Sequence, residues 1–511
     1  MPQACVIAVD LADVWADPQR KKLLRTLAWG DQVSVLSVTP SHVELEFTRF
    51  VSQSDGSAKP VAEIGYVKPT AASRIRVEEV VRPAAENTVL RVNFVDVQQG
   101  DGAVIESPTG KVILVDGGDN KMFARYLAGR FRGTTQEQPK TVDCILVTHG
   151  DADHFSGLVE LRKSEGLKKP GYPRLYIQPL RVYHNGLVKR PEKDGDRKRK
   201  QTEMLGPTAE KDGKLYLTGL VQNLLTDVPE AEMNKPFQNW RKALQAYNQR
   251  ANITFERLAF GSDNAFDFFN QGDLQIECLG PMVEDVDGKL GLRFLGSPPN
   301  GPRTAEDAMD STVPAFRGRS ASHTINGHSV VFRLRYGHFS YLFCGDLNDE
   351  AGRHLVQQHT AGALNLRSDV FKVPHHGSAD FSGAFIQAVA PLVSVVSSGD
   401  ESERKEYIHP RATLMGALGR HARSEEPLIF VTELVAFFKM ENMVQSTNAR
   451  RAAKQGPFFG FSRAAFGMVK TRTDGRRLLV YSDSANLQMK EAYAFTSDGR
   501  ADPVPVAIRR A

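Results

Sequence analysis

The chain of 511 residues contains 41% hydrophobic and 24% charged residues, a balance that excludes a mostly disordered or fibrous protein. Its length predicts two or three domains, each able to bury a core. Lys and Arg outnumber Asp and Glu by 65 to 60, and the formal net charge of +5 is too dilute to indicate an anionic partner by itself.

The cysteines and the apolar segments indicate the expected compartment. Cys5, Cys144, Cys278 and Cys344 are scattered and form no CxxC pair, so neither a disulfide framework nor a thiolate zinc finger is expected. The N-terminal segment meets Asp10 early and lacks the basic start of a secretory signal. No segment reaches the roughly 18 apolar residues that a membrane span needs. We therefore expect a cytoplasmic protein that contacts no membrane.

Residues 1–80 are expected to form a small β-barrel. Alternating segments at Gln32–Ser37, His42–Phe50 and Gly65–Lys68 are separated by Gly, Asp, Ser and Pro turns, which is typical of short strands. The runs LLRTLAWGDQVSVL, VELEFTRF and IGYVKP resemble a bacterial SH3-like domain. The resemblance implies a module that binds a peptide or protein partner, and a packing domain without a ligand of its own is the alternative.

From residue 88 the chain changes to an α/β pattern. Apolar segments with Gly-rich turns alternate with segments of helical periodicity. The expected strands are Val89–Val97, Ala103–Glu106, Val112–Val115 and Cys144–Thr148, and the expected helices include Lys121–Phe131 and Phe155–Lys163.

Two long polar insertions and a folded tail follow. The stretch 182–214 contains the basic residues Lys189, Arg190, Lys193, Arg197, Lys198, Arg199 and Lys200. Such a run is a solvated loop or a phosphate-binding edge. Residues 296–324, rich in Gly, Pro, Ser and Arg, are expected to be flexible or lid-like. Residues 445–511 are expected to be a β-rich extension, with a hairpin that turns at Asp474-Gly475.

The first chemical motif follows the segment CILVTH. His149, Asp151, Asp153 and His154 fall within six positions, and a fixed turn there points several of these side chains at one place. Neutral imidazole and ionised carboxylate are natural ligands of zinc, manganese and iron. The motif therefore predicts a metal site, and a polar turn at a strand end is the alternative.

Two further motifs lie at the ends of apolar segments. YLFCGDLND places Asp346 at an expected sheet edge, where sites of open α/β sheets tend to lie, although alone it could be a turn or a helix cap. DVFKVPHHGS runs directly into His375 and His376. The three motifs in this order, HxDxDH, GD and HHGS, are much more specific together than any one of them.

In these motifs the chain resembles the metallo-β-lactamase superfamily, and especially the hydrolase domain of the ComEC family of DNA-uptake proteins, over about residues 88–440. The segment VNFVDVQQGDGAVIESPTGKVILVDGG is similar to the family's opening FxDVGQGD…ILIDGG. The resemblance implies a four-layer αββα sandwich with the site at one edge between the two sheets. It also implies that Asp96, Asp101 and Asp116 shape the loops under the metals and are not themselves ligands.

The resemblance further implies two divalent metal ions, zinc or manganese. His149 and Asp151 would hold the first ion, Asp153 and His154 would hold the second, and Asp346 would bridge them. The final ligand is His375 or His376, and the sequence leaves open which of the two faces the substrate. The residues implied near the substrate are His409, Ser378, Arg404 and Lys405.

Two departures from the superfamily pattern concern the first ion. Asp151 stands where many members have a second histidine, which favours a harder metal such as manganese alongside zinc. The histidine that commonly follows the first motif has no clear counterpart, and His323 and His328 are possible substitutes. The first metal site could therefore be incomplete.

The expected chemistry is hydrolysis of a phosphodiester by a metal-activated hydroxide. Asp153 would orient the water, and His376 or His409 would protonate the leaving oxygen. The resemblance favours a nucleic acid substrate, which the basic insertion would also suit. The alternatives are a hydrolase of the same fold that acts on a cyclic nucleotide, lactone or β-lactam, and a binding scaffold that works through the SH3-like module.

Overall fold

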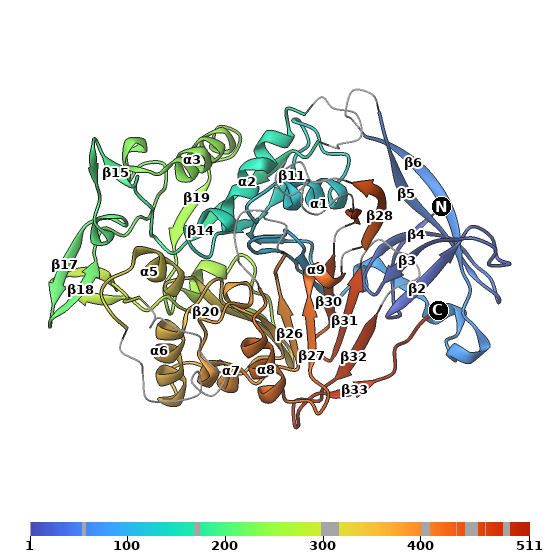
Figure 1. Ribbon diagram of the computed structural model, residues 1–511. Helices are drawn as coiled ribbons and strands as arrows, with labels where there is room; N and C mark the ends of the chain where they lie inside the picture. Colours follow the sequence, from blue (N-terminus) through green and yellow to red (C-terminus); the bar gives the residue numbers. More distant parts are fainter. Residues whose placement is uncertain are drawn as a thin grey trace.

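Two β-sheets packed face to face form the centre of the molecule (Figure 1). The computed structural model describes residues 2–53, 58–167, 174–297, 316–399, 409–435, 437–444, 458–465, 467–483 and 491–511. The first sheet has ten strands in the order β19-β14-β12-β10-β9-β8-β30-β31-β32-β33, and the second has six in the order β20-β23-β24-β25-β26-β27.

Nearly every strand of the two sheets is short and apolar on the face that meets the other sheet. The first sheet contains β8 (Leu90–Val95), β9 (Gly102–Glu106), β10 (Val112–Asp116), β12 (Cys144–Leu146), β14 (Arg181–His184), β19 (Thr254–Arg257), β30 (Met468–Thr473), β31 (Arg477–Asp483), β32 (Ala492–Thr496) and β33 (Val504–Val506). The second contains β20 (Leu274–Gly280), β23 (Val331–Tyr336), β24 (Phe339–Phe343), β25 (Val370–Lys372), β26 (Val393–Val396) and β27 (Leu428–Val431).

Helices cover the outer face of each sheet. Side chains of α1 (Met122–Arg130), α2 (Ala152–Ser164) and α3 (Lys235–Asn248) form one core with the first sheet. Those of α6 (Asp349–Thr360), α7 (Gly383–Val389) and α8 (Ala412–His421) form another with the second sheet. Figure 1 shows the two groups on opposite sides of the paired sheets. The expected αββα sandwich is thereby confirmed.

The core between the sheets is built on stacked aromatic rings. The rings of Phe332 and Phe343 lie 4.6 Å apart at an interplanar angle of 6°, and Phe94 from the first sheet stacks on Phe343 at 5.7 Å. Aromatic pairs of this kind add to the free energy gained by burying their area. These contacts fix the spacing of the two sheets, and with it the positions of the loops at their edge.

The N-terminal residues form a separate seven-stranded antiparallel sheet with its own core. Its strands are β1 (Gln3–Ile7), β2 (Leu11–Trp15), β3 (Leu23–Ala28), β4 (Gln32–Val38), β5 (Val43–Ser52), β6 (Ala58–Val67) and β7 (Val81–Pro83). The expected strands in this region are confirmed, and the SH3-like assignment stays a prediction. The C-terminal residue Ala511 packs into the same core, so the two ends of the chain lie side by side (Figure 1).

The tail of the chain belongs to the first sheet. Strands β30 and β31 pair in antiparallel register with Thr473 opposite Leu478, which confirms the hairpin expected at Asp474-Gly475. Strand β30 also pairs with β8, so the tail extends the sheet that the opening strands began. The domain boundaries expected at residues 80, 88, 440 and 445 stay predictions.

The first insertion forms a small lobe of short strands at one end of the molecule (Figure 1). Strands β17 (Thr208–Lys211), β18 (Lys214–Leu217), β22 (Lys289–Arg293) and β21 (Glu284–Val286) make a four-stranded sheet, and β15 (Lys193–Asp194) pairs with β16 (Arg197–Lys198). Helix α5 (Ala321–Gly327) packs against the lobe. Most of the second expected insertion, residues 298–315, lies outside the described residues.

Smaller elements connect these layers. Strands β11 (Lys140–Val142) and β13 (Ile177–Pro179) form one pair, β28 (Phe437–Val444) and β29 (Phe458–Ala465) form another, and α9 (Thr432–Val435) follows β27. All four cysteines are buried and unpaired, which agrees with the expected absence of a disulfide framework. Within the described ranges, no helix has the length and apolar character needed to cross a bilayer.

Replacing Phe332 with alanine should lower the free energy of unfolding by about 3–5 kcal/mol, because it removes a stacked ring from the core between the sheets. Chemical denaturation followed by fluorescence measures the change. The control is Leu290→Ala, whose side chain is 48% exposed and should change stability by less than about 0.5 kcal/mol. Equal losses in the two variants would contradict the assignment of this core.

Candidate metal centre

Three loops bring the chemical motifs together at one edge of the sandwich. Strands β10, β12 and β14 run parallel to one another, as do β24, β25, β26 and β27, and the motifs follow β12, β24 and β25 directly. The carboxyl ends of parallel strands meet at the same edge of a sheet. The HxDxDH, GD and HHGS segments therefore converge although about 200 residues separate the first from the last.

Helix α2 fixes the second half of the first motif. It begins at Ala152, so Asp153 and His154 lie in its first turn, where the positive end of the helix favours a carboxylate. The loop below approaches closely, because a Cβ atom on Gly100 would lie 1.8 Å from the backbone oxygen of Asp153. Only glycine fits at that position, which also has a φ of +99°.

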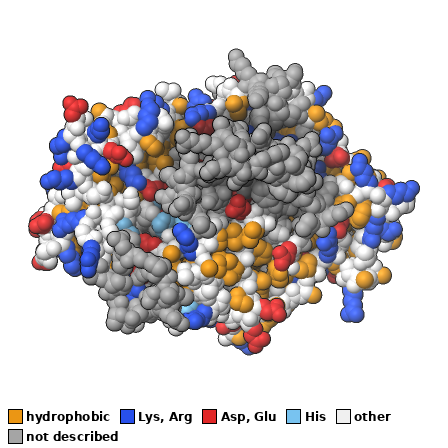
Figure 2. Space-filling view, in the orientation of Figure 1, with side chains coloured by type: hydrophobic (Ala, Val, Ile, Leu, Met, Phe, Trp, Pro, Cys, Tyr) orange, Lys and Arg blue, Asp and Glu red, His pale blue; other side chains and the backbone are white. Residues whose placement is uncertain are grey.

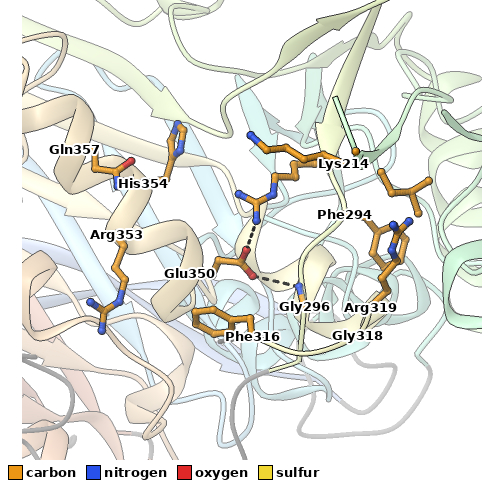
Figure 3. Close-up of a pocket in the computed structure, with 13 residues that line it drawn as sticks. Lys214, Phe294, Gly296, Phe316, Gly318, Arg319, Glu350, Arg353, His354 and Gln357 are labelled. Atoms are coloured by element: carbon orange, nitrogen blue, oxygen red, sulfur yellow. Dashed lines mark hydrogen bonds and ion pairs between the residues drawn. The ribbon is translucent and has the colours of Figure 1, made fainter. Parts of the chain in front are cut away.

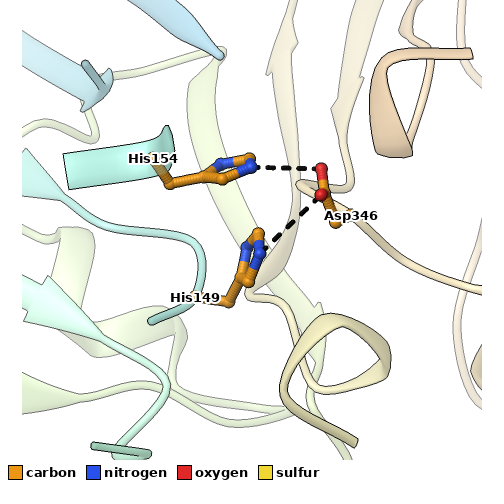
Figure 4. A group of neighbouring side chains, drawn as sticks. All are labelled: His149, His154 and Asp346. Atoms are coloured by element: carbon orange, nitrogen blue, oxygen red, sulfur yellow. Dashed lines mark ion pairs between the residues drawn. The ribbon is translucent and has the colours of Figure 1, made fainter. Parts of the chain in front are cut away.

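The carboxylate of Asp346 is the centre of the site. Its Oδ1 lies 3.2 Å from Nε2 of His154 and 3.2 Å from Nε2 of His376. Its Oδ2 lies 3.8 Å from Nε2 of both His149 and His375. Figure 4 shows His149, from the loop after β12, and His154, from α2, pointing at Asp346. Each oxygen of one carboxylate thus faces two imidazoles.

The opposite nitrogens of two imidazoles are held by buried carboxylates. Nδ1 of His154 lies 2.9 Å from Oδ2 of Asp116. The Thr148 hydroxyl also donates to this Oδ2, and the backbone N–H of Thr148 donates to Oδ1. Nδ1 of His376 lies 3.2 Å from Oδ1 of Asp101. Such contacts fix the tautomer and orientation of a metal-binding histidine, so Asp116 and Asp101 turn the two Nε2 atoms toward Asp346.

The donor atoms at Asp346 fit a divalent metal ion. Nε2 of His149 is buried and makes no hydrogen bond within the described residues, and Nε2 of His154 and Nε2 of His376 share one oxygen of Asp346. Buried polar atoms normally find a partner, so this cluster indicates a missing ligand. Sets of donor atoms within 4.8 Å of one another include His149 with His154 and Asp346, and Asp153 with His154 and His376. Imidazole nitrogens and carboxylate oxygens are ligands of zinc and manganese.

The electrostatics of the cluster favour positive charge. Burial works against the charged form of His376, but Asp346 and Asp101 outweigh it and raise the pKa of His376 to about 10. Burial is likewise outweighed by Asp346 and Asp116 at His154, whose pKa lies well above the usual value. The pKa of His149 is lowered well below the usual value by burial and by the charge of His154. The carboxylates thus create a place for cations, which an ion would occupy in exchange for protons.

The backbone at the HHGS motif is strained. His375 and His376 both adopt left-handed conformations, with φ of 51° and 53°. Each such residue costs about 1–3 kcal/mol and persists where the surrounding structure holds it, often at functional sites. With this backbone, the two neighbouring rings face different oxygens of Asp346. Nε2 of His376 also lies 3.7 Å from Oδ2 of Asp153, so the geometry favours His376 as a ligand of the same ion as Asp153.

The remaining ligand candidates have other partners. The ammonium of Lys189 contacts Oδ1 of Asp151. Oδ2 of Asp153 lies 3.4 Å from Nε2 of Gln99, which donates to it. His323 pairs through Nδ1 with Asp380 at 3.2 Å. Nε2 of His328 lies 2.7 Å from the carbonyl oxygen of Arg293. Neither His323 nor His328 belongs to the donor sets at Asp346 within the described residues.

Of the four residues expected near the substrate, the structure describes His409 and Ser378. The ring of His409 lies 6.3 Å from that of His375, at the outer side of the cluster. Burial and the charges of His376 and His375 lower the pKa of His409 to about 4. Ser378 accepts a hydrogen bond from the backbone of Asp380 at 3.2 Å. Arg404 and Lys405 lie outside the described residues, and their substrate role stays a prediction.

Asp96 supports the loop below the site. Its Oδ1 accepts a hydrogen bond from the backbone of Gln98 at 3.1 Å, and its Oδ2 accepts one from the backbone of Gly467 at 3.4 Å. The carboxylate is fully buried. It therefore connects the loop before β9 to the start of β30, in agreement with the loop-shaping role that the resemblance implies.

Two lysines near the site were not singled out from the sequence as site residues. Lys372 is buried in β25 and donates to Asp101 at 2.8 Å, which balances the carboxylate that orients His376. The sequence signal that could have identified Lys372 is a lysine within an otherwise apolar strand. Lys189 was noted only as part of the basic run 189–200, and nothing in that run distinguishes it from its neighbours.

A cavity of about 450 Å³ lies between the lobe and helix α6 (Figure 3). Four cationic side chains and one carboxylate line it, namely Lys214, Arg293, Arg319, Arg353 and Glu350. Glu350 is engaged by Arg293 at 2.8 Å and by the backbone of Gly296 at 3.2 Å. Arg353 and Arg319 also have acidic partners, Asp349 at 2.8 Å and Glu210 at 3.9 Å. The lining is therefore rich in basic side chains that are mostly paired, and Asp346 lies three residues before α6.

Replacing Asp116 with asparagine should weaken metal binding by roughly 10–100-fold, because an amide no longer holds Nδ1 of His154 as a carboxylate does. Equilibrium dialysis with Zn²⁺ or Mn²⁺ measures the dissociation constant. Asp196→Asn is the control, because Asp196 is exposed in the lobe and should leave the constant unchanged. An unchanged constant in Asp116→Asn would show that this carboxylate does not support the centre.

Known proteins share this part of the chain. Residues 95–222 match the family model of the metallo-beta-lactamase superfamily. ComE operon protein 3 of Bacillus subtilis (strain 168) is 32% identical over 98 residues, 19% of this chain and 12% of that protein. Competence protein ComA of Neisseria gonorrhoeae is 35% identical over 97 residues, 19% of this chain and 13% of that protein. The chain thus covers only a small part of either relative.

One solved structure that the chain matches is Tm1679, described as a metal-dependent hydrolase of the beta-lactamase superfamily. It has a TM-score of 0.29 and 12% identity, and the alignment covers 67% of this chain and 96% of that one. The family match, the αββα layers and the HxDxDH motif at the sheet edge lead to one assignment. Residues 95–222 thus match the metallo-β-lactamase superfamily, and the chain is similar over 98 and 97 residues to ComE operon protein 3 and competence protein ComA.

Proposed function

We propose that the protein is a metal-dependent phosphodiesterase or nuclease. The observation that carries the proposal is the carboxylate of Asp346, which is 3% exposed and faces four imidazoles from two sheets. A purely structural carboxylate needs few partners, whereas four imidazole Nε2 atoms converge on Asp346, and that of His149 makes no hydrogen bond among the described residues. Zinc or manganese is the proposed metal, on the basis of the mixed nitrogen and oxygen donors.

The metal supplies two effects when bound: it lowers the pKa of a coordinated water, and it stabilises charge on the phosphodiester oxygens. Asp153 is placed to orient the attacking water, since its Oδ2 is near His376 and Gln99. The water releases one proton to solvent and its oxygen forms a bond to phosphorus, while the bond from phosphorus to the leaving oxygen breaks. Nε2 of His376 faces Asp346, and the lowered pKa of His409 keeps its ring neutral near pH 7, so the leaving oxygen is proposed to take its proton from solvent water.

A nucleic acid is the proposed substrate. Support comes from the similarity to the two competence proteins and from the basic side chains that line the cavity between the lobe and α6. The basic run 189–200 contributes less than its sequence suggests, because Arg197 and Arg199 pair with Asp194, and Arg197 also pairs with Glu203. Figure 2 shows basic and acidic side chains interspersed over that end of the molecule.

A small-molecule hydrolase is the second candidate function. The cavity of about 450 Å³ has the size of a site for a small ligand, so it would also suit a compact phosphate ester such as a cyclic nucleotide. Ionic strength distinguishes the two functions, because binding of a polymeric phosphate backbone weakens steeply with salt and binding of a small anion weakens little.

Asp153→Ala and Asp346→Ala should each lower kcat/KM by at least about 100–1000-fold, because each removes a side chain from the metal centre. The measurement uses bis(p-nitrophenyl) phosphate, single-stranded DNA and duplex DNA, with Mn²⁺ or Zn²⁺ added after chelation. Asp212→Ala in the lobe is the matched control and should keep full activity. Activity retained in both site variants would remove the metal centre from the mechanism.

Lys214→Ala and Arg319→Ala should raise the KM for DNA by roughly 10-fold and reduce the salt dependence of binding, because each removes a cation from the cavity. The same variants should leave turnover of bis(p-nitrophenyl) phosphate unchanged, since none of the described residues that line the cavity belongs to the donor sets of the metal centre. Lys21→Ala, an exposed lysine of the N-terminal sheet, is the control. An equal loss with both substrates would contradict a separate role for the cavity.

A further inference from the structure

The carboxylate of Asp151 is engaged on both oxygens. The Lys189 ammonium contacts Oδ1. The side-chain amide of Asn326, oriented with its nitrogen toward the site, donates to Oδ2 at 3.1 Å and to the backbone oxygen of Ser322 at 3.0 Å. Asp151 and Lys189 are about equally enclosed, with 20% and 21% of their side chains exposed. The pair is therefore a partly buried ion pair held in place by further contacts, and it differs from an ion pair on the surface.

The backbone places Lys189 in the site. It follows β14, the neighbour of β12 in the sheet, so its loop leaves from the same edge as the HxDxDH motif. Asn185 in this loop donates to the backbone oxygen of His328 at 2.9 Å, and the backbone of Asn234 donates to that of Lys189 at 2.9 Å. The loop is thus tied at both ends, and the ammonium is held beside Asp151.

No described histidine completes a site around Asp151. His323 and His328, the substitutes suggested by the sequence, are bound to Asp380 and to the backbone of Arg293. His375 reaches Oδ2 of Asp346 at 3.8 Å, but the donor sets within 4.8 Å in the described chain do not combine it with His149. The ligands left for a first ion are one imidazole and one shared carboxylate oxygen.

We propose that the Lys189 ammonium takes the place of the first metal ion, so that the centre binds one divalent ion per chain. The residues that would hold this ion are Asp153, His154, His376 and Asp346. The inference rests on the metal centre of the proposed function. It replaces the two ions that the family resemblance implies with one ion and one fixed lysine.

Simple electrostatics explains why the lysine excludes a second ion. An ammonium and a divalent cation that share one carboxylate repel each other strongly at the low effective dielectric constant of a buried site. The ammonium also balances the charge of Asp151, and, unlike a metal ion, it has no coordination position to fill with further ligands. Lysine is a compact point charge with three donors, so it can support a bound phosphate oxygen as well as Asp151.

Metal stoichiometry tests the proposal without reference to turnover. The full chain is dialysed against Mn²⁺, the bound metal is measured by elemental analysis, and electron paramagnetic resonance distinguishes a single ion from a coupled pair. We expect one Mn²⁺ per wild-type chain with a mononuclear spectrum. Lys189→His, which replaces the ammonium with an imidazole ligand, should bind two ions and give the spectrum of a coupled pair.

A second pair of variants keeps the test independent of the folding of Lys189→His. Asp151→Asn should still bind one ion, whereas Asp153→Asn, two residues away, should bind it roughly 10–100-fold more weakly. Lys193→His, an exposed lysine of the same segment, is the matched control and should stay at one ion.

The remaining outcomes contradict either the role of Lys189 or the metal centre itself. Two ions in the wild-type chain, loss of the ion in Asp151→Asn, or a folded Lys189→His that stays at one ion would each contradict the role of Lys189 and leave the proposed function intact. A wild-type chain that binds no ion would contradict the metal centre itself, and the proposed function would fail with it.

Discussion

The structure of the site depends on one buried carboxylate that needs positive charge from both halves of the sandwich. Asp346 comes from the second sheet, and its partners His149 and His154 come from the first. Burying a carboxylate is costly unless cations and hydrogen bonds compensate for the lost water. The two sheets must therefore stay in one relative position, and the stacking of Phe94 from the first sheet on Phe343 of the second helps to maintain it.

Counter-charges around Asp346 are arranged in layers. Asp101 and Asp116 hold the outer nitrogens of His376 and His154, and Lys372 in turn balances Asp101 at 2.7 Å. Lys372 is the largest of the attractive charges that outweigh burial and lower the pKa of Asp101 to about 2. The centre is thus an alternating network of acids and bases, and a metal ion would take the place of protons within it.

The lobe beside the metal centre is the part of the structure that can determine which substrate binds. The lobe of short strands brings Lys189 to Asp151 on one side and, with α6, encloses the cavity lined by basic side chains on the other. Fold alone does not select a substrate, because one superfamily fold supports several chemistries. In this protein the lobe is the element that can make the selection, since it carries charges beside both the reaction centre and the cavity.

The sequence by itself determined the layers, the motifs and most of the ligand types, because apolar periodicity and residues at strand ends are local signals. It indicated His149, Asp153, His154 and Asp346 from motif order alone. Only the tertiary structure decided the orientation of the HHGS histidines and the partner of Asp151. Those depend on contacts between residues far apart in the chain, such as His376 with Asp101 and Lys189 with Asp151, and no local pattern encodes such pairs.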